Sequence, residues 1–293
     1  MVLLVLDLAP GRRSQSISLK RSLIWSAIWV TLAATFAAIL HWWQGGTTTL
    51  EFSTAYLIEL SLSVDNLFVF LLIFRHFNIP LGDQHKVLLW GIVGAMVMRG
   101  IFIFAGVGLL RKFDWLVYVF GAFLILSGLR LFVKDKSEIH PEKSRILKLF
   151  QKFIPVTEDT SGDSFFIRRS RLYATPLFLV LVLIETADLL FALDSIPAVL
   201  AISRNFMIVF TSNILAILGL RSMYFALAGV IGSFKSLHYG LSAVLIFVGI
   251  KMLIGHYHEI PTAQMLAAVG AILLISVLVS LFSKTETHPP PPA

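Results

Sequence analysis

The sequence predicts an all-α membrane protein, a bundle of about eight transmembrane helices with a 3+3 inverted repeat. Three observations predict this fold: long apolar runs, a resemblance between the two halves of the chain, and acidic residues inside the apolar runs. Of the 293 residues, 57% are hydrophobic and 14% are charged, and the mean hydropathy is +0.84. A soluble domain carries about 25% charged residues. The composition therefore excludes a soluble enzyme.

Eight apolar runs are long enough to cross a bilayer, which needs about 20 residues. They are 22–43, 52–74, 87–110, 115–133, 177–201, 206–231, 237–254 and 262–282. None shows the alternating pattern of a transmembrane strand, so helices are expected. Met1–Leu8 is apolar but too short to span, and the proline run after His288 predicts a disordered tail.

The runs divide the chain into five parts. Residues 1–51 hold an N-terminal stub, a basic segment and the first helix. Three helices follow in 52–133, a basic loop in 134–175, three more helices in 176–254, and the last helix with the tail in 255–293.

The placement of basic residues predicts the orientation in the membrane. The chain has 24 Lys+Arg against 17 Asp+Glu, and 17 of those bases fall on one side of the predicted spans while three fall on the other. Cytoplasmic loops carry an excess of Lys and Arg. We therefore expect the 134–175 loop and the C-terminus to be cytoplasmic, in a bacterial inner membrane, and no nucleic-acid partner. The chain has no cysteine, which excludes thiolate metal sites and disulfides.

The two groups of three helices resemble each other, and their charged positions align as well as their apolar ones. An odd number of spans in each unit makes the second enter the membrane from the opposite side, as in the inverted repeats of secondary transporters. The aligned pairs are Glu59–Asn66 with Asp188–Ser195, Arg99 with Arg221, and Phe113–Phe132 with Phe234–Leu253.

Acidic side chains inside the spans are the main functional signal. An ionised group at the bilayer centre costs about 2.5–3.5 kcal/mol on insertion scales, so such residues are functional candidates. Arg99 and Arg221 lie deep enough to pair with them, which leaves a surplus of acids for a cation or protons. The alternative is that the acids pair with arginine for structural reasons alone. The five acids are Glu59, Asp65, Glu185, Asp188 and Asp194.

Both acidic helices are predicted to break near their second aspartate. Pro197 cannot donate an N–H to a helix, and Asn66 and Ser195 offer hydrogen bonds that compete with the helical ladder. Interrupted helices at matching positions of two halves indicate a binding site. We therefore expect breaks near Asp65 and Asp194, where freed carbonyls join the carboxylates.

Oxygen ligands without thiolates suit hard divalent ions such as Mn²⁺, Mg²⁺ or Ca²⁺. Asn213 and its neighbours in the sixth span offer neutral oxygens to such an ion, or hydrogen bonds between helices. His256 and His258 fall in a loop that we interpret as solvated rather than metal-binding. Glycines at 91, 94, 100, 106 and 108 fit close helix packing.

These residues resemble the TerC family of integral membrane proteins, within the wider group of exporters that includes the lysine exporters. The resemblance rests on Tyr56–Asn66, Phe113–Phe123, Tyr173–Leu177, Glu185–Pro197 and Thr211–Tyr224. It implies export of Mn²⁺ or a related divalent cation, with a link to tellurite resistance, and a further helix before the basic segment Arg12–Arg21. By motif position it implies metal ligands at Glu59, Asp65, Asn66, Glu185, Asp188 and Asp194, and we expect Ser195, Asn213, Arg99 and Arg221 to support them.

Export of a divalent ion from a negative-inside cell costs about 4.6 kcal/mol per 100 mV. The sequence has no nucleotide-binding motif, so exchange for protons is the expected source of this free energy. Neither an enzyme activity nor a permanently bound cofactor is expected. Two alternatives remain open: a non-transporting membrane scaffold or sensor, and an exporter of small organic solutes. The sequence leaves the oligomeric state open.

Overall fold

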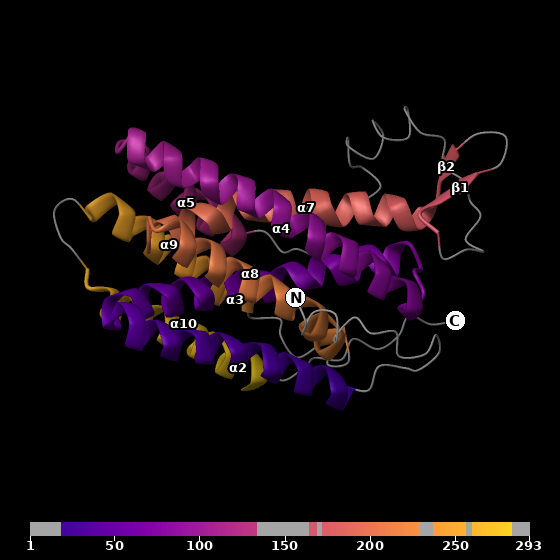
Figure 1. The fold of residues 1–293 in the computed structure, drawn as a ribbon, viewed down its shortest axis with the longest axis horizontal. Helices are drawn as coiled ribbons and strands as arrows, with labels where there is room; N and C mark the ends of the chain where they lie inside the picture. Colours follow the sequence, from indigo (N-terminus) through magenta and orange to yellow (C-terminus); the bar gives the residue numbers. More distant parts are fainter. Residues whose placement is uncertain (1–18, 134–163, 169–171, 229–236, 256–259, 283–293) are drawn as a thin grey trace.

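The computed structural model is a helical bundle with one short β-hairpin at one end (Figure 1). It describes residues 19–133, 164–168, 172–228, 237–255 and 260–282. In this part of the chain the helices are α2 (Leu19–Gln44), α3 (Gly46–His76), α4 (Leu81–Lys112), α5 (Leu116–Val133), α7 (Pro176–Leu200), α8 (Phe206–Ala228), α9 (Leu237–Ile254) and α10 (Thr262–Phe282). The antiparallel strands β1 (Phe166–Arg168) and β2 (Leu172–Ala174) form the hairpin that leads into α7.

Each predicted apolar run corresponds to one of these helices, which confirms the all-α membrane fold class. Seven helices in the described ranges are long and apolar enough to cross a membrane, and α9 is the shorter one. The predicted bounds were too short for α3 and α4, which have 31 and 32 residues. A helix of that length rises about 47 Å, more than the roughly 30 Å of a hydrocarbon core, so both helices tilt or extend beyond it.

The prediction of broken helices near Asp65 and Asp194 was wrong. Both α3 and α7 run without interruption. Pro197 lies in the last turn of α7, where its missing N–H removes one hydrogen bond and little helix follows. Polar side chains in α3 bond within the helix instead of breaking it, as when Thr54 Oγ1 donates to the Leu50 carbonyl at 2.7 Å.

The helices pack so that α3, α7 and α8 share the interior. The most extensive helix contacts join α5 with α9, α3 with α8, and α4 with α7. In Figure 1, α2 and α10 lie along one side of the bundle, while α4, α5 and α7 lie on the other. At the end of α2, Trp42 and Trp43 are 91% and 78% exposed, which fits aromatic rings at a membrane–water interface.

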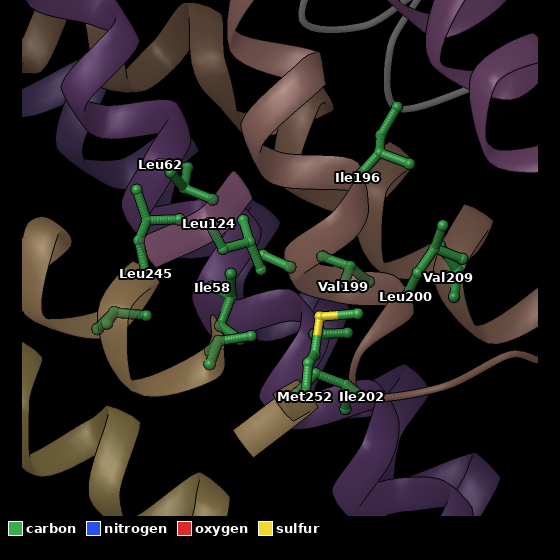
Figure 2. Packing of buried hydrophobic residues seen from close by; sticks show 14 of the residues in the cluster. Ile58, Leu62, Leu124, Ile196, Val199, Leu200, Ile202, Val209, Leu245 and Met252 are labelled. Atoms are coloured by element: carbon green, nitrogen blue, oxygen red, sulfur yellow. The ribbon is translucent and has the colours of Figure 1, made fainter. Parts of the chain in front are cut away.

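Two apolar clusters fill opposite halves of the interior. Figure 2 shows the first, where Ile58, Leu124, Val199 and Met252 bring together α3, α5, α7 and α9. The second contains the opposite halves of α4 and α7 with the C-terminal halves of α3 and α8. Asp188, at the midpoint of α7, lies between the stretches that α7 gives to the two clusters.

The crossing of α5 and α9 depends on two glycines. A Cβ at Gly128 would lie 2.9 Å from the carbonyl oxygen of Ser242, and a Cβ at Gly249 would lie 2.7 Å from that of Gly121. Both distances are too short for any larger residue, so the two backbones come closer here than side chains allow. Small residues permit this approach between helices in membranes.

Several predictions lie outside the described residues. They concern the stub before residue 19, most of the basic loop 134–175, the loop containing His256 and His258, and the tail after residue 282. The predicted orientation and the inverted repeat stay predictions.

Candidate functional site

The centre of the bundle holds a buried arginine between two carboxylates. Arg99 in α4 is 1% exposed and donates from Nη1 to Glu59 Oε2 in α3 at 2.7 Å. It also donates to Asp188 in α7, from Nη2 to Oδ1 at 2.8 Å and from Nε to Oδ2 at 3.2 Å. The bidentate geometry on Asp188 is the strong form of an arginine–carboxylate pair. Glu59 and Asp188 are therefore paired with an arginine, as the structural alternative from the sequence predicted.

A fourth helix completes this group. Asn213 in α8 donates from Nδ2 to Glu59 Oε1 at 2.7 Å, so both oxygens of that carboxylate accept a hydrogen bond. Glu59, Asp188 and Asn213 are all at most 3% exposed. We call Glu59, Arg99, Asp188 and Asn213 the central cluster. It ties α3, α4, α7 and α8 together through charge between the two apolar clusters.

Polar side chains continue along α3 and α7 beside the central cluster. Ser63 and Asn66 follow Glu59 at helical spacing and are 0% and 3% exposed, and Ser195 follows Asp188 and is 1% exposed. Among the described residues, the hydroxyl oxygens of Ser63 and Ser195 and the Oδ1 of Asn213 have no hydrogen-bond partner. Buried polar atoms are nearly always satisfied by protein, water or an ion, so these oxygens are available to a bound species.

Glu185 lies one turn before Asp188 and reaches α4 at a position without a side chain. A Cβ at Gly94 would lie only 2.0 Å from Glu185 Oε1, which means that the carboxylate occupies the space above this glycine. Glu185 forms no hydrogen bond or ion pair with another described residue. Glu185 therefore has no arginine partner among the described residues.

Asp194 points to a different neighbour. Ser127 Oγ in α5 donates to Asp194 Oδ1 at 2.7 Å, so this acid lies away from the hydrogen bonds of Arg99. The backbone of Asp65 belongs to α3, and its side chain lies outside the described part of the structure. Among the described residues, no three Asp, Glu or His side chains group closely enough to hold a metal ion.

A small cavity opens beside Asp188. Gly91, Asp188 and Arg221 line it together with apolar side chains of α3, α4, α7 and α8, and its volume is about 20 Å³. A volume of this size holds one water molecule. Arg221 thus lies across the cavity, whereas Arg99 lies within the central cluster.

Polar contacts join the helices at the end formed by the α4–α5 and α7–α8 connections. Lys251 Nζ in α9 donates to the carbonyl oxygen of Ala201, the residue that caps α7. Arg204 Nη1 lies 3.0 Å from Asp114 Oδ1, and both side chains are well exposed. A cation at a helix C-terminus interacts favourably with the unpaired carbonyls there.

Sequence reasoning missed several of these residues. Ser127 is a single serine in an apolar helix and gave no signal. Lys251 lies near the end of its apolar run, where a lysine can extend to the membrane surface, while the structure turns it onto Ala201. Gly94 was noted only for close packing, and its relation to Glu185 needed the three-dimensional structure.

Comparison with known proteins gives consistent matches over nearly the whole chain. Residues 44–289 match the model of the integral membrane protein TerC family. An uncharacterized membrane protein of Myxococcus xanthus, STKORF319, is 48% identical over 96% of this chain and 89% of its own length. Alx of Escherichia coli K12, whose name proposes a membrane-bound redox modulator, is 42% identical over 95% of this chain and 90% of its own. No solved structure gives a significant match.

Proposed function

Because the chain belongs to the TerC family of integral membrane proteins, we propose that it exports a divalent metal cation, Mn²⁺ first among them, in exchange for protons. The proposed setting is a bacterial inner membrane, with the 134–175 loop and the C-terminus in the cytoplasm. The cation is the substrate, and lipid, metal ion and protons are the partners that this function requires. The supporting features are the central cluster, the surrounding oxygen atoms and the pattern of helix contacts.

One observation carries the proposal: carboxylates from two different helices pair with the same guanidinium, that of Arg99, in the middle of the bundle. Glu59 and Asp188 both bond Arg99, at 2.7 and 2.8 Å. The same pair of carboxylates is suited to an inorganic cation, because hard divalent ions prefer carboxylate and neutral oxygen ligands. Glu185 adds a third acid beside this pair, so the carboxylates outnumber Arg99.

Neutral oxygens that surround the acids support the same substrate. The unpartnered buried atoms Ser63 Oγ, Ser195 Oγ and Asn213 Oδ1 all accept a cation as readily as a hydrogen bond. Asn66, which the family resemblance includes among the ligands, is buried on the same face of α3 as Glu59. We propose that Asp65 and Asp194 act on the same ion at another stage of its passage.

An inverted repeat of two three-helix units is part of the proposal, and the contacts between α5 and α9 support it. A shift of 121 residues relates Gly128 to Gly249 and Gly121 to Ser242. The contact of Gly128 with the carbonyl oxygen of Ser242 therefore has a counterpart in the contact of Gly249 with the carbonyl oxygen of Gly121. The alignment of Glu59 with Asp188 and of Arg99 with Arg221 pairs α3 with α7 and α4 with α8, with shifts of 129 and 122 residues. The contact between α3 and α8 then becomes that between α7 and α4, and both are extensive. Such reciprocity is typical of two units related by a two-fold axis.

Proton exchange supplies the free energy in this mechanism. Two protons entering for each divalent ion that leaves make the cycle electroneutral, which removes the electrical cost of about 4.6 kcal/mol per 100 mV. Metal ligands must be deprotonated, so binding of the ion releases the protons that the acids hold.

The names of the relatives, the absence of cysteine and the volume of the cavity bear on the alternatives. This chain has no cysteine, so any redox role within these 293 residues does not use thiol–disulfide chemistry. A cavity of about 20 Å³ is far smaller than the sites of about 300 Å³ or more that hold organic ligands, which disfavours a small organic solute. A scaffold or sensor function would depend on the basic loop rather than on the central cluster.

The test is transport by the purified protein in liposomes, with Mn²⁺, Mg²⁺, Ca²⁺ and Zn²⁺ compared under an imposed pH gradient. We expect Mn²⁺ flux that follows the proton gradient and falls by at least about tenfold in Asp188→Asn, because charge count tunes such sites. The matched control is Asp114→Asn, an exposed acid on a connection, which should transport at the parental rate. Gradient-independent flux, or equal flux in both variants, would contradict the proposal and favour the scaffold.

A further inference from the structure

The two apolar clusters separate the central cluster from the two ends of the bundle. The first fills the half at the α7–α8 connection, and the second fills the half where the hairpin leads into α7 (Figure 1). The start of α4 lies at that same end, because Lys86 Nζ is 5.1 Å from the centre of the Phe165 ring just before β1. We call it the hairpin end. An ion reaches the central cluster only after one of the two apolar clusters has parted.

A chain of two hydrogen bonds crosses the hairpin end. Tyr224 Oη in α8 donates to Gln84 Oε1 in the first turn of α4 at 2.9 Å. Gln84 Nε2 in turn donates to the carbonyl oxygen of Ile79, in the connection between α3 and α4, at 2.8 Å. The three residues are at most 8% exposed, and Tyr224 and Ile79 belong to the second apolar cluster. The chain therefore ties α8 to the start of α4, out of reach of bulk water.

Aromatic contacts lie at the same crossing. The ring centres of Tyr224 and Phe74, near the end of α3, are 5.5 Å apart in an edge-on arrangement. Those of His85 in α4 and Phe225 in α8 are 4.2 Å apart. In the proposed inverted repeat, α3 and α4 belong to one unit and α8 to the other. Transporters of this kind move one repeat against the other, and such a motion breaks contacts that cross between the units.

The other end of the α4–α8 crossing differs in its side chains. The shift of 122 residues that relates α4 to α8 places Phe206 at the position of Gln84. It places Phe102 at the position of Tyr224. A phenylalanine side chain has no hydrogen-bonding group, and Phe206 contacts the ring of Phe104 at 6.1 Å instead. The same two helices are therefore joined by a buried hydrogen bond at the hairpin end and by ring contacts at the other.

We propose that the two hydrogen bonds of Gln84 form a latch, which keeps the hairpin end closed over the central cluster, and that this end opens when the latch parts. The inference rests on the proposed function, because it concerns access to the same carboxylates. It assigns a role in gating to Gln84 and Tyr224, which are not ligands and lie in different units.

Removing the latch should make opening at the hairpin end easier. Opening breaks the bond between Tyr224 and Gln84, so a variant that lacks this bond has less to lose. Loss of one buried hydrogen bond changes an equilibrium by roughly tenfold. Tyr224→Phe deletes only the hydroxyl group and keeps the ring beside Phe74. It should therefore raise the population that is open at the hairpin end by about this factor.

The absence of native cysteine allows opening to be measured with single-cysteine variants. Leu220→Cys places a thiol one turn before Tyr224, in the second apolar cluster. Val209→Cys places the matched thiol on the same helix in the first apolar cluster. Leu220 and Val209 are 5% and 0% exposed, so a charged methanethiosulfonate reacts only when the respective half opens. Labelling rates are measured in membrane vesicles of known orientation, without Mn²⁺ and without a pH gradient.

We expect Tyr224→Phe to speed labelling of Leu220→Cys roughly tenfold, from the hairpin side only, and to leave Val209→Cys unchanged. Gln84→Met breaks both bonds of the latch and should have at least the same effect. Combining it with Tyr224→Phe should bring no further increase, because the bond between the two side chains is already lost. Tyr118→Phe, at a 43% exposed tyrosine of α5, is the matched control and should change neither rate.

Transport kinetics separate a gate from local loosening of the helix ends. An ion that binds only an open form has an apparent affinity in proportion to the population of that form. Tyr224→Phe should therefore lower the apparent KM for Mn²⁺ supplied at the hairpin side severalfold, while Tyr118→Phe keeps the parental KM. Loosening that gives no access to the central cluster would leave this KM unchanged.

Faster labelling at both cysteines would show general loosening of the bundle, and an unchanged rate at Leu220→Cys would show that the latch does not limit opening. Either result overturns the inference. Additive effects of Tyr224→Phe and Gln84→Met also overturn it, because the two side chains would then act independently. An unchanged KM in a protein that transports Mn²⁺ overturns the gate. Absence of parental Mn²⁺ flux contradicts the proposed function instead, and the labelling rates still decide the latch.

Discussion

Replacing Arg99 by methionine removes the charge at the centre of the bundle and keeps much of the length of the side chain. The arginine makes three hydrogen bonds of 2.7 to 3.2 Å to two carboxylates and is 1% exposed. Removing one partner of a buried ion pair costs about 3–5 kcal/mol, because the remaining charge has no compensation. Here two carboxylates remain, and we expect the upper part of that range.

Thermal unfolding in detergent, followed by tryptophan fluorescence, measures this cost. At about 2 °C per kcal/mol for a chain of this size, Arg99→Met should lower the midpoint by roughly 8–10 °C. Mn²⁺ should then recover part of the loss, since a ligand at 100 times its dissociation constant stabilises by about 2.7 kcal/mol. The parental protein should gain less, because its carboxylates already hold a guanidinium.

The matched control is Arg204→Gln, which removes an exposed arginine that also pairs with an acid. Its side chain is 47% exposed, and exposed pairs contribute under about 1 kcal/mol, so its midpoint should stay near the parental value with or without Mn²⁺. An unchanged midpoint in Arg99→Met would show that the central cluster does not stabilise the bundle. A lower midpoint with no added effect of Mn²⁺ would show that the acids do not bind this cation.

Four further predictions concern single residues. Gly94→Ala should reduce Mn²⁺ transport severalfold in liposomes, because its methyl meets a carboxylate at 2.0 Å, while Gly108→Ala has open space and should transport normally. Asp194→Asn should reach the membrane in normal amounts on immunoblots yet lose Mn²⁺ export, since a neutral amide is cheaper to bury than a charge; parental export would contradict the carboxylate mechanism. Ser127→Ala should lower the unfolding free energy by about 1.5 kcal/mol through loss of its 2.7 Å hydrogen bond to that acid. Ser161→Cys, in a chain without native cysteine, should be labelled by impermeant maleimide only from the cytoplasmic side.

Apolar runs and charge placement predicted the helices because span length and insertion cost are fixed by the bilayer. Helix continuity was predicted incorrectly, since a proline in a last turn and a few polar side chains do not break a helix that packing holds. The sequence identified Glu59, Asp188 and Arg99 as unusual but did not place them in contact. That contact depends on how α3, α4 and α7 rotate about their axes, which amphipathic patterns do not specify in a helix surrounded by lipid on one side and protein on the other.

The difference between Asn213 in one half of the chain and Gly91 in the other is visible in the sequence, but the sequence alone does not show its effect. Asn213 and Gly91 each lie eight residues before an arginine, Arg221 and Arg99, yet glycines in membrane helices most often serve packing. Only the cavity beside Asp188 shows that the missing side chain changes the surroundings of a charge.

In the proposed export cycle, the guanidinium of Arg99 would be a tethered competitor for any ion that the two carboxylates receive. Because it is covalently attached within bonding distance of Glu59 and Asp188, its effective concentration is on the order of millimolar or higher. The apparent affinity for an incoming ion is weakened in proportion, whatever the intrinsic strength of the ligands. In that proposed cycle the same side chain would also help release at the far side, because its return displaces the ion. Affinity in this bundle is thus adjustable at a residue that never touches the substrate.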